Sequence, residues 1–137
     1  MKPHQTILVL EDDSLEALTL ERAFTDAIVP NPWVIFATAQ EGLSYLHRQD
    51  VERPGLVLLD LNLPGMSGLD FLRRMKADVH LRSIPVVILT SSSDEQERRE
   101  AFELSAAGYF VKPIQYGPFV ELIKVVKSYW LLAETAG

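Results

Sequence analysis

Short apolar runs, separated by longer segments with helical periodicity, constrain the fold of this 137-residue chain most strongly. Four runs are clear and lack polar alternation, which is typical of strands covered on both faces of a parallel sheet. They are residues 7–10, 56–59, 86–89 and 109–111, and residues 33–37 form a weaker candidate. Strands that alternate with helices form right-handed βα units, so we expect a parallel sheet with helices on both faces.

The segments between the runs predict five helices, because their apolar residues recur at steps of three and four. The first helix has Ser14 as a candidate N-cap, and its apolar positions are Leu15, Leu18, Ala23 and Ala27. The next three are expected around residues 43–46, 69–76 and 94–104. The fifth is the clearest, with one stripe formed by Phe119, Leu122, Ile123, Val126 and Trp130. Five such units fit one domain of this length.

Composition excludes several classes of function. The net charge of −6 disfavours binding to nucleic acid or anionic membranes. The absence of cysteine excludes disulfides, thiolate metal sites and cysteine nucleophiles. The N-terminus lacks the apolar stretch of a secretory signal, and no run approaches the roughly 18 residues of a membrane span. We therefore expect a soluble, cytoplasmic protein without nucleic-acid or membrane partners.

Polar residues directly follow the clear runs, and the carboxyl ends of parallel strands meet at one sheet edge. Glu11 and Asp12 follow the first run, Asp60 follows the second, Thr90 the third and Lys112 the last. Carboxylates gathered at one edge repel each other unless a cation balances them, and magnesium prefers oxygen ligands. The pattern predicts a magnesium site on Asp12 and Asp60, with Glu11 acting through a water and Lys112 as counter-charge.

Each of these residues also has a plain structural alternative. The acidic segment 11–13 is compatible with simple capping of the following helix, which is the role expected for Asp13. Asp60 and Thr90 are compatible with turn or capping roles, and Lys112 with a solvated loop. The conjunction of these residues at four strand ends favours a site over four unrelated roles.

Four motifs in this order resemble the receiver domain of two-component response regulators, over about residues 5–132. They lie at residues 7–13 (ILVLEDD), 58–68 (LLDLNLPGMSG), 84–90 (IPVVILT) and 107–113 (AGYFVKP). The resemblance implies a flavodoxin-like doubly wound (βα)5 fold, a five-stranded parallel sheet of order 2-1-3-4-5. It also implies one receiver domain over residues 1–137, with a C-terminal helix extension at residues 128–137.

The resemblance implies that Asp60 accepts a phosphoryl group from the phosphohistidine of a histidine kinase. Lys112 would pair with Asp60 or the phosphoryl oxygens, and Thr90 would donate a hydrogen bond. Slow loss of the phosphoryl group would make the protein a timed switch rather than an enzyme with turnover. The implied magnesium ligands are Glu11, Asp12, Asp60 and the backbone carbonyl of Asn62.

Output is expected to pass through surface contacts. The resemblance implies that Thr90 moves toward the phosphoryl group and that Tyr109 turns inward, and that the bond between Lys112 and Pro113 is cis. We expect a homodimer through the face of the fourth helix, fifth strand and fifth helix; the alternative buries Trp130 in the core. The residues expected on this surface are Tyr116, Phe119, Trp130 and Leu131.

Four segments resemble one branch in particular, the stand-alone regulators paired with bacterial and cyanobacterial phytochrome kinases. They are residues 27–32, 81–85, 90–95 and 129–131. A haloacid-dehalogenase-type phosphatase is disfavoured, because Asn62 stands where that family needs a second aspartate as acid and base. The remaining alternative is a phosphorylation-independent adaptor of the same fold. Phosphate-sink behaviour, in which the protein drains a shared kinase, would be a different role for the same chemistry.

Overall fold

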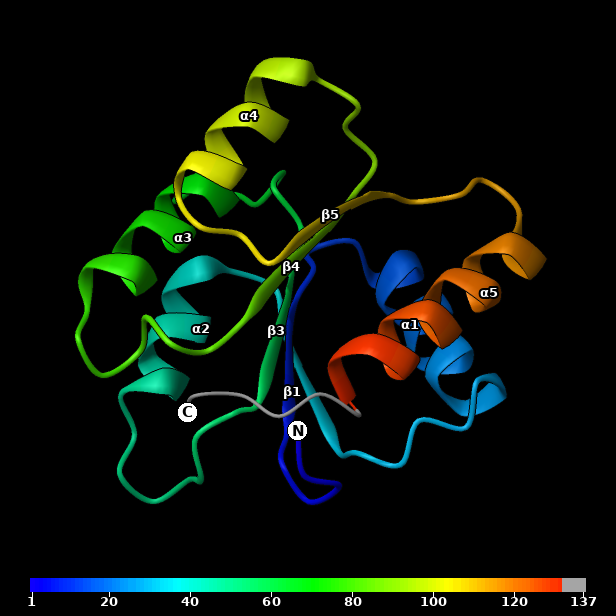
Figure 1. The fold of residues 1–137 in the computed structure, drawn as a ribbon, viewed down its shortest axis with the longest axis horizontal. Coiled ribbons are helices and arrows are strands. Elements are labelled where there is room, and N and C mark those ends of the chain that lie inside the picture. The colour runs from blue at the N-terminus through cyan, green and yellow to red at the C-terminus, as the bar shows by residue number, and fades with distance from the viewer. Residues whose placement is uncertain (132–137) are drawn as a thin grey trace.

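Five short strands form one parallel sheet in the computed structural model, which describes residues 1–131. The sheet order is β2-β1-β3-β4-β5, and every neighbouring pair is parallel (Figure 1). This confirms the predicted doubly wound sheet of order 2-1-3-4-5. The strands are β1 (Ile7–Leu10), β2 (Trp33–Phe36), β3 (Leu56–Leu59), β4 (Val86–Thr90) and β5 (Gly108–Val111).

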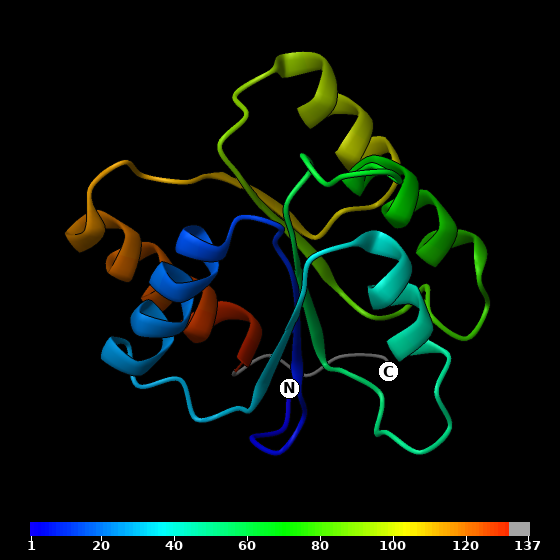
Figure 2. The ribbon, with the colours of Figure 1, turned by 180° about the vertical axis from the view of Figure 1, so that it is seen from behind.

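Helices cover both faces of the sheet. The pair α1 and α5 lies on one face, and α2, α3 and α4 lie on the other (Figures 1 and 2). Their bounds are α1 (Ser14–Asp26), α2 (Ala39–Leu46), α3 (Gly68–Ala77), α4 (Glu95–Glu103) and α5 (Tyr116–Val126), and a π-helical turn, Lys127–Leu131, follows α5. No helix of residues 1–131 is long and apolar enough to cross a membrane.

Two apolar layers hold the sheet between the helices. Strands β1, β3 and β4 are buried along their whole length, because helices cover both of their faces. Strand β2 lies at the edge and is only half-buried, which explains why its run is a weaker signal in the sequence. Three of the four clear apolar runs therefore mark the centre of the sheet, and the fourth lies in the other edge strand, β5.

The predicted start and buried face of α1 require correction. The N-cap is Asp13 rather than Ser14, which confirms the capping role expected for Asp13: its carboxylate accepts hydrogen bonds from the amides of Leu15 (2.9 Å) and Glu16 (3.1 Å). Leu15 is 73% exposed and Leu18 62% exposed. The stripe that packs on the sheet begins one turn later and consists of Leu20, Ala23, Phe24 and Ala27.

The end of the described chain packs against β5. Phe119, Ile123 and Val126 are buried, as the predicted stripe of α5 requires. The Trp130 ring meets Phe110 edge-on at 6.0 Å between centroids. It also covers Gly108, where an added Cβ would lie 3.0 Å from the indole. The predicted extension begins as the π-helical turn, and residues 132–137 lie outside the described part of the chain.

The peptide bond between Lys112 and Pro113 is trans, so the expected cis bond is wrong, and residues 1–131 contain no cis bond. A trans bond before proline is favoured by about 0.5–1 kcal/mol in the absence of other constraints. The Lys112 amide donates to the Thr90 carbonyl at 2.7 Å, so the lysine continues the β5 pairing up to the proline. The trans bond therefore does not remove Lys112 from the sheet edge.

Candidate functional site

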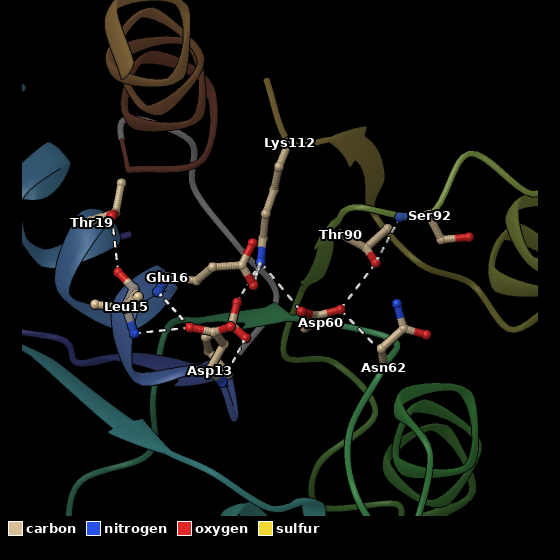
Figure 3. Close-up of polar contacts among 10 residues, drawn as sticks. Asp13, Leu15, Glu16, Thr19, Asp60, Asn62, Thr90, Ser92 and Lys112 are labelled. Carbon is tan, nitrogen blue, oxygen red and sulfur yellow. Dashed lines mark hydrogen bonds and ion pairs between the residues drawn. The ribbon is translucent and has the colours of Figure 1, made fainter. Parts of the chain in front are cut away.

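Four polar side chains meet at the carboxyl edge of the sheet, each at the end of a different strand. Glu11 follows β1, Asp60 follows β3, Thr90 ends β4 and Lys112 follows β5. The Lys112 ammonium donates to Glu11 and, at 3.2 Å, to Oδ2 of Asp60 (Figure 3). The Thr90 hydroxyl donates to Oδ1 of Asp60 at 3.0 Å. The sequence pattern thus predicted which strand ends converge.

The Asp60 carboxylate is held from three sides. Its Oδ1 atom accepts from the Thr90 hydroxyl and, at 3.0 Å, from the amide of Asn62, while Oδ2 faces Lys112. Asp60 is only 5% exposed, and Thr90 is fully buried. In the described part of the chain, every buried side-chain polar atom has a hydrogen-bond partner. The carboxylate is therefore fixed in orientation, and a cavity lined in part by Glu11, Asp60 and Lys112 adjoins it.

Charge at the site is set by burial and by Lys112. Burial raises the pKa of Glu11 from 4.5 to about 7, although its hydrogen bond to Lys112 opposes this. Burial also opposes the charge of Lys112, but its hydrogen bond to Glu11 and the negative charges of Asp60 and Glu16 raise the pKa of the ammonium overall. Lys112 therefore stays cationic at neutral pH, whereas the pKa of Glu11 lies close to neutral pH.

Three carboxylates offer a set of ligands for a hard cation. One oxygen each from Glu11, Asp12 and Asp60 lie within 4.8 Å of one another. Asp12 is exposed, whereas the other two are buried, so the group opens to solvent on one side. Oxygen donors at this spacing fit Mg²⁺, which commonly uses one or two carboxylates and keeps several waters. The Asn62 amide is placed by its bond to Asp60, and its carbonyl as a ligand stays a prediction.

Gly68 helps to position Asp60, and the sequence pattern did not single it out for this role. An added Cβ on Gly68 would lie 2.5 Å from the backbone oxygen of Asp60 and 2.6 Å from Cα of Leu61. The Gly68 amide also donates to the Leu61 carbonyl at 3.1 Å. The start of α3 therefore packs directly on the backbone that carries Asp60, and only glycine fits there. A glycine one residue after a Ser N-cap was the available signal.

Glu16 was also missed as part of the site. It lies in the first turn of α1, and its carboxylate is 3.3 Å from Lys112 (Figure 3). The sequence signal is its place three residues after the capping Asp13, which orients the turn toward the sheet edge. Glu16 is thus the third carboxylate that contacts the ammonium, after Glu11 and Asp60.

The two predicted switch residues are linked through the loop after β4. The Tyr109 hydroxyl donates to the Ser92 carbonyl at 3.0 Å, and the Ser92 amide donates to the Thr90 hydroxyl at 3.3 Å. Tyr109 is half-buried against the core layer under α4. A second orientation of Tyr109 stays a prediction.

The residues predicted for a dimer surface do not form one exposed surface in the structure. Phe119 is 5% exposed and lies in the core under α1, so its placement on a surface is wrong. Trp130 covers Gly108 and Phe110, which is the core alternative weighed for it. The Tyr116 hydroxyl donates to Asp26 at 2.6 Å, so Tyr116 belongs to the seam between α1 and α5. The side chain of Leu131 lies outside the described part of the chain.

Comparison with known proteins identifies relatives of similar length. The chain is 31% identical to the probable methanogenesis regulatory protein FilR2 of Methanothrix harundinacea, over 91% of this chain and 83% of the relative. It is 28% identical to the response regulator Rcp1 of Synechocystis, over 94% of this chain and 90% of Rcp1. The alignments therefore cover most of each relative as well as most of this chain.

Solved structures of response regulators have the same fold as this chain. The crystal structure of the phosphorylated cyanobacterial phytochrome response regulator RcpA superimposes with a TM-score of 0.90 at 29% identity, covering 98% of this chain and 99% of RcpA. The crystal structure of the Mn²⁺-bound form of Rcp1 superimposes with a TM-score of 0.88 at 26% identity, covering 97% of this chain and 99% of Rcp1. The family profile described as response regulator receiver domain matches residues 7–124. The chain therefore belongs to the response regulator receiver domain family.

Proposed function

We propose that Asp60 accepts a phosphoryl group from the phosphohistidine of a histidine kinase, and that this acyl phosphate switches a protein-interaction surface. The arrangement around Asp60 carries the proposal. Its carboxylate is buried and oriented by Lys112, Thr90 and the Asn62 amide, with Glu11 beside it. Phosphoryl transfer requires mainly positioning and neutralisation of charge, and these groups supply both.

In the proposed step, one carboxylate oxygen of Asp60 attacks phosphorus while the bond between phosphorus and the imidazole nitrogen breaks. The imidazole leaves with the electron pair of that bond, and Asp60 becomes an acyl phosphate. The Lys112 ammonium neutralises charge that moves onto the Asp60 side of the transfer. The Thr90 hydroxyl provides a hydrogen-bond donor for the phosphoryl oxygens after it leaves Oδ1.

Magnesium is the proposed cofactor, and it would neutralise phosphoryl charge during transfer. The residues proposed to hold it are Glu11, Asp12, Asp60 and the Asn62 carbonyl. Their carboxylate spacing supports this, as does the Mn²⁺-bound form of the related Rcp1. Glu11 contributes fully only when it is deprotonated, because a protonated carboxyl is a poor ligand for a hard cation.

Exposed apolar side chains near the site support a protein as phosphodonor. Leu15 and Leu18 project from α1, and Ile114 follows Lys112 by two residues and is fully exposed. A cavity of about 350 Å³ is lined by Ile114 together with Asp60 and Lys112. A histidine kinase is the class of donor that the family implies, and the likeness to RcpA supports a phytochrome kinase within that class.

The proposed output is a change of surface rather than an enzymatic reaction with turnover. Residues 1–137 are proposed to act as one receiver domain with slow loss of the phosphoryl group. A homodimer through α4, β5 and α5 remains part of the proposal, with a revised set of contacts. The exposed apolar side chains on these elements are Phe102, Val111 and Val125, and Tyr129 is exposed on the π-helical turn that follows α5.

The dimer is tested by solution mass at micromolar concentration, using Val125→Asp with Tyr129→Ser against the wild type. A lower mass in the variant supports this surface. A dimeric variant would exclude it, and a monomeric wild type with and without phosphodonor would exclude the dimer itself.

The test of the main proposal is intact-protein mass after incubation with phosphoramidate and Mg²⁺. Wild type should gain the mass of one phosphoryl group, and Asp60→Asn should gain none. Asp13→Asn is the matched control, because Asp13 caps α1 and has no proposed part in transfer, so it should be phosphorylated. No gain in a folded wild type that binds Mg²⁺ would favour the phosphorylation-independent adaptor instead.

A further inference from the structure

Ser92 makes hydrogen bonds to three separate parts of the molecule. It lies in the loop between β4 and α4, and its amide donates to the Thr90 hydroxyl at 3.3 Å. Its carbonyl accepts from the Tyr109 hydroxyl on β5 at 3.0 Å. Its own hydroxyl donates to Oε1 of Glu97 on α4 at 2.5 Å. One residue thus joins the end of β4, strand β5 and helix α4.

These bonds continue to the proposed phosphorylation site. The Thr90 hydroxyl that accepts from the Ser92 amide donates to Oδ1 of Asp60 at 3.0 Å (Figure 3). An unbroken series of hydrogen bonds therefore runs from Asp60 through Thr90 and Ser92 to Glu97. Each step is made by a group that is at least partly shielded from solvent.

The surrounding residues show that this series is specific. Ser91 and Ser93 flank Ser92 but are exposed, and neither side chain has a hydrogen bond in the described chain. In the first turns of α4, Glu97 is half-buried and turns back to the loop, whereas Glu95 is exposed and pairs with Arg98 at 3.4 Å. Ser92 and Glu97 are therefore the partly buried members of this loop and helix start, and they bond to each other.

Helix α4 has few other anchors, apart from its N-cap Asp94, which accepts from the amides of Gln96 and Glu97. Ala101 is its one buried residue, and the ion pair between Glu100 and Arg73 on α3 is exposed. Exposed ion pairs contribute little to stability, whereas a partly shielded hydrogen bond to a charged group contributes more. The Ser92 hydroxyl contacts this start of α4 twice, because it donates to Glu97 and accepts from the amide of Asp94 at 3.3 Å.

We infer that Ser92 and Glu97 are positioning residues that couple phosphorylation of Asp60 to the position of α4. This inference rests on the proposed function. When Asp60 becomes an acyl phosphate, the phosphoryl oxygens are stronger acceptors than Oδ1, and the Thr90 hydroxyl turns toward them. The Ser92 amide follows the hydroxyl that it contacts, and the Ser92 side chain carries the displacement to Glu97. The partner surface that changes is then the exposed face of α4.

Hydrogen exchange of the α4 amides tests this coupling, measured with and without phosphoramidate and Mg²⁺, while intact mass records phosphorylation in the same samples. In wild type, phosphorylation should change exchange rates in the first turns of α4 by about fivefold, the scale of one lost or gained hydrogen bond. Ser92→Ala should be phosphorylated but lose most of this change. Ser92→Thr keeps the hydroxyl and should restore it, and Ser93→Ala should behave as wild type.

Glu97→Ala removes the same bond from the other end and should reproduce the result of Ser92→Ala. An unchanged response of α4 in phosphorylated Ser92→Ala and Glu97→Ala would overturn the coupling while leaving phosphoryl transfer intact. Loss of phosphorylation in Ser92→Ala would place Ser92 in the transfer step and also overturn the inference. Absence of the mass gain in wild type would instead refute the proposed function, and the coupling with it.

Discussion

Helices α1 and α4 flank the same sheet edge but are held there in different ways. Helix α1 buries Leu20, Ala23 and Phe24, packs along α5 and is capped by Asp13. Helix α4 is also capped, by Asp94, but it buries only Ala101 and begins from an exposed loop. On the α1 side of the site, the Lys112 ammonium makes ionic contacts, whereas on the α4 side the uncharged hydroxyl of Thr90 donates a hydrogen bond to Asp60. The rigid side suits chemistry, and the lightly held side suits a change of surface.

The largest expected effect contrasts one aromatic residue from each helix. Phe24→Ala removes a fully buried ring under α1 and should lower the free energy of unfolding by about 3–5 kcal/mol. Phe102→Ala, on α4, removes a half-exposed ring and should cost less than about 1.5 kcal/mol. Chemical denaturation of both variants measures the difference. Equal losses would mean that α4 is anchored as firmly as α1.

The next effect concerns the backbone that carries Asp60. Gly68→Ala places a Cβ against the Asp60 carbonyl and should destabilise the fold by about 1–3 kcal/mol while slowing phosphorylation. Gly117→Ala is the matched control, because nothing lies within 4 Å of the added Cβ in α5, and it should be neutral or slightly stabilising. Denaturation and the rate of mass gain are the two measurements. If Gly68→Ala were destabilised but phosphorylated at the normal rate, the contact between α3 and the Asp60 backbone would support the fold without positioning Asp60 for phosphorylation.

A third prediction uses the raised pKa of Glu11. Below pH 7 this carboxyl is increasingly protonated in the folded protein, and Mg²⁺ must displace that proton. The affinity for Mg²⁺ should therefore rise with pH, by up to about tenfold per unit below pH 7, and level off above it. Titration calorimetry at pH 6, 7 and 8 measures this, and Glu11→Gln should bind more weakly with a flatter profile. A flat wild-type profile would remove Glu11 from the metal site.

The smallest effect is expected at the ion pair that joins α3 to α4. Arg73 and Glu100 lie 3.1 Å apart, and both are exposed. Glu100→Ala should lower the free energy of unfolding by no more than about 1 kcal/mol, and less at high salt. Denaturation at low and high salt measures it. A loss of several kcal/mol would show that α4 depends on this pair, contrary to the contrast drawn above.

Much of the fold and the centre of the site could be predicted from the sequence. Buried parallel strands require unbroken apolar runs, and Asp60 and Lys112 end up together because their strands point the same way. The register of α1 could not be predicted reliably, because Leu15 and Leu18 satisfy helical spacing yet face solvent. Spacing identifies a stripe, whereas packing decides which stripe is buried.

Other features depend on atoms that spacing does not describe. Phe119 is apolar in a helix near the expected dimer face, and only the packing of α5 under α1 shows that it is core. Ser92 is one of three consecutive serines, and loop geometry alone distinguishes it from its neighbours. Gly68 is identifiable as a helix start, but its approach to Asp60 requires coordinates.

The contact of Trp130 with Phe110 and Gly108 gives the molecule its own optical probe. The chain has two tryptophans, and the other, Trp33, donates to Glu21 on α1 at 3.0 Å. The two indoles therefore report from opposite edges of the sheet. Replacing Trp33 by Phe leaves a single fluorophore beside β5, whose emission follows the docking of the C-terminal turn without any added label.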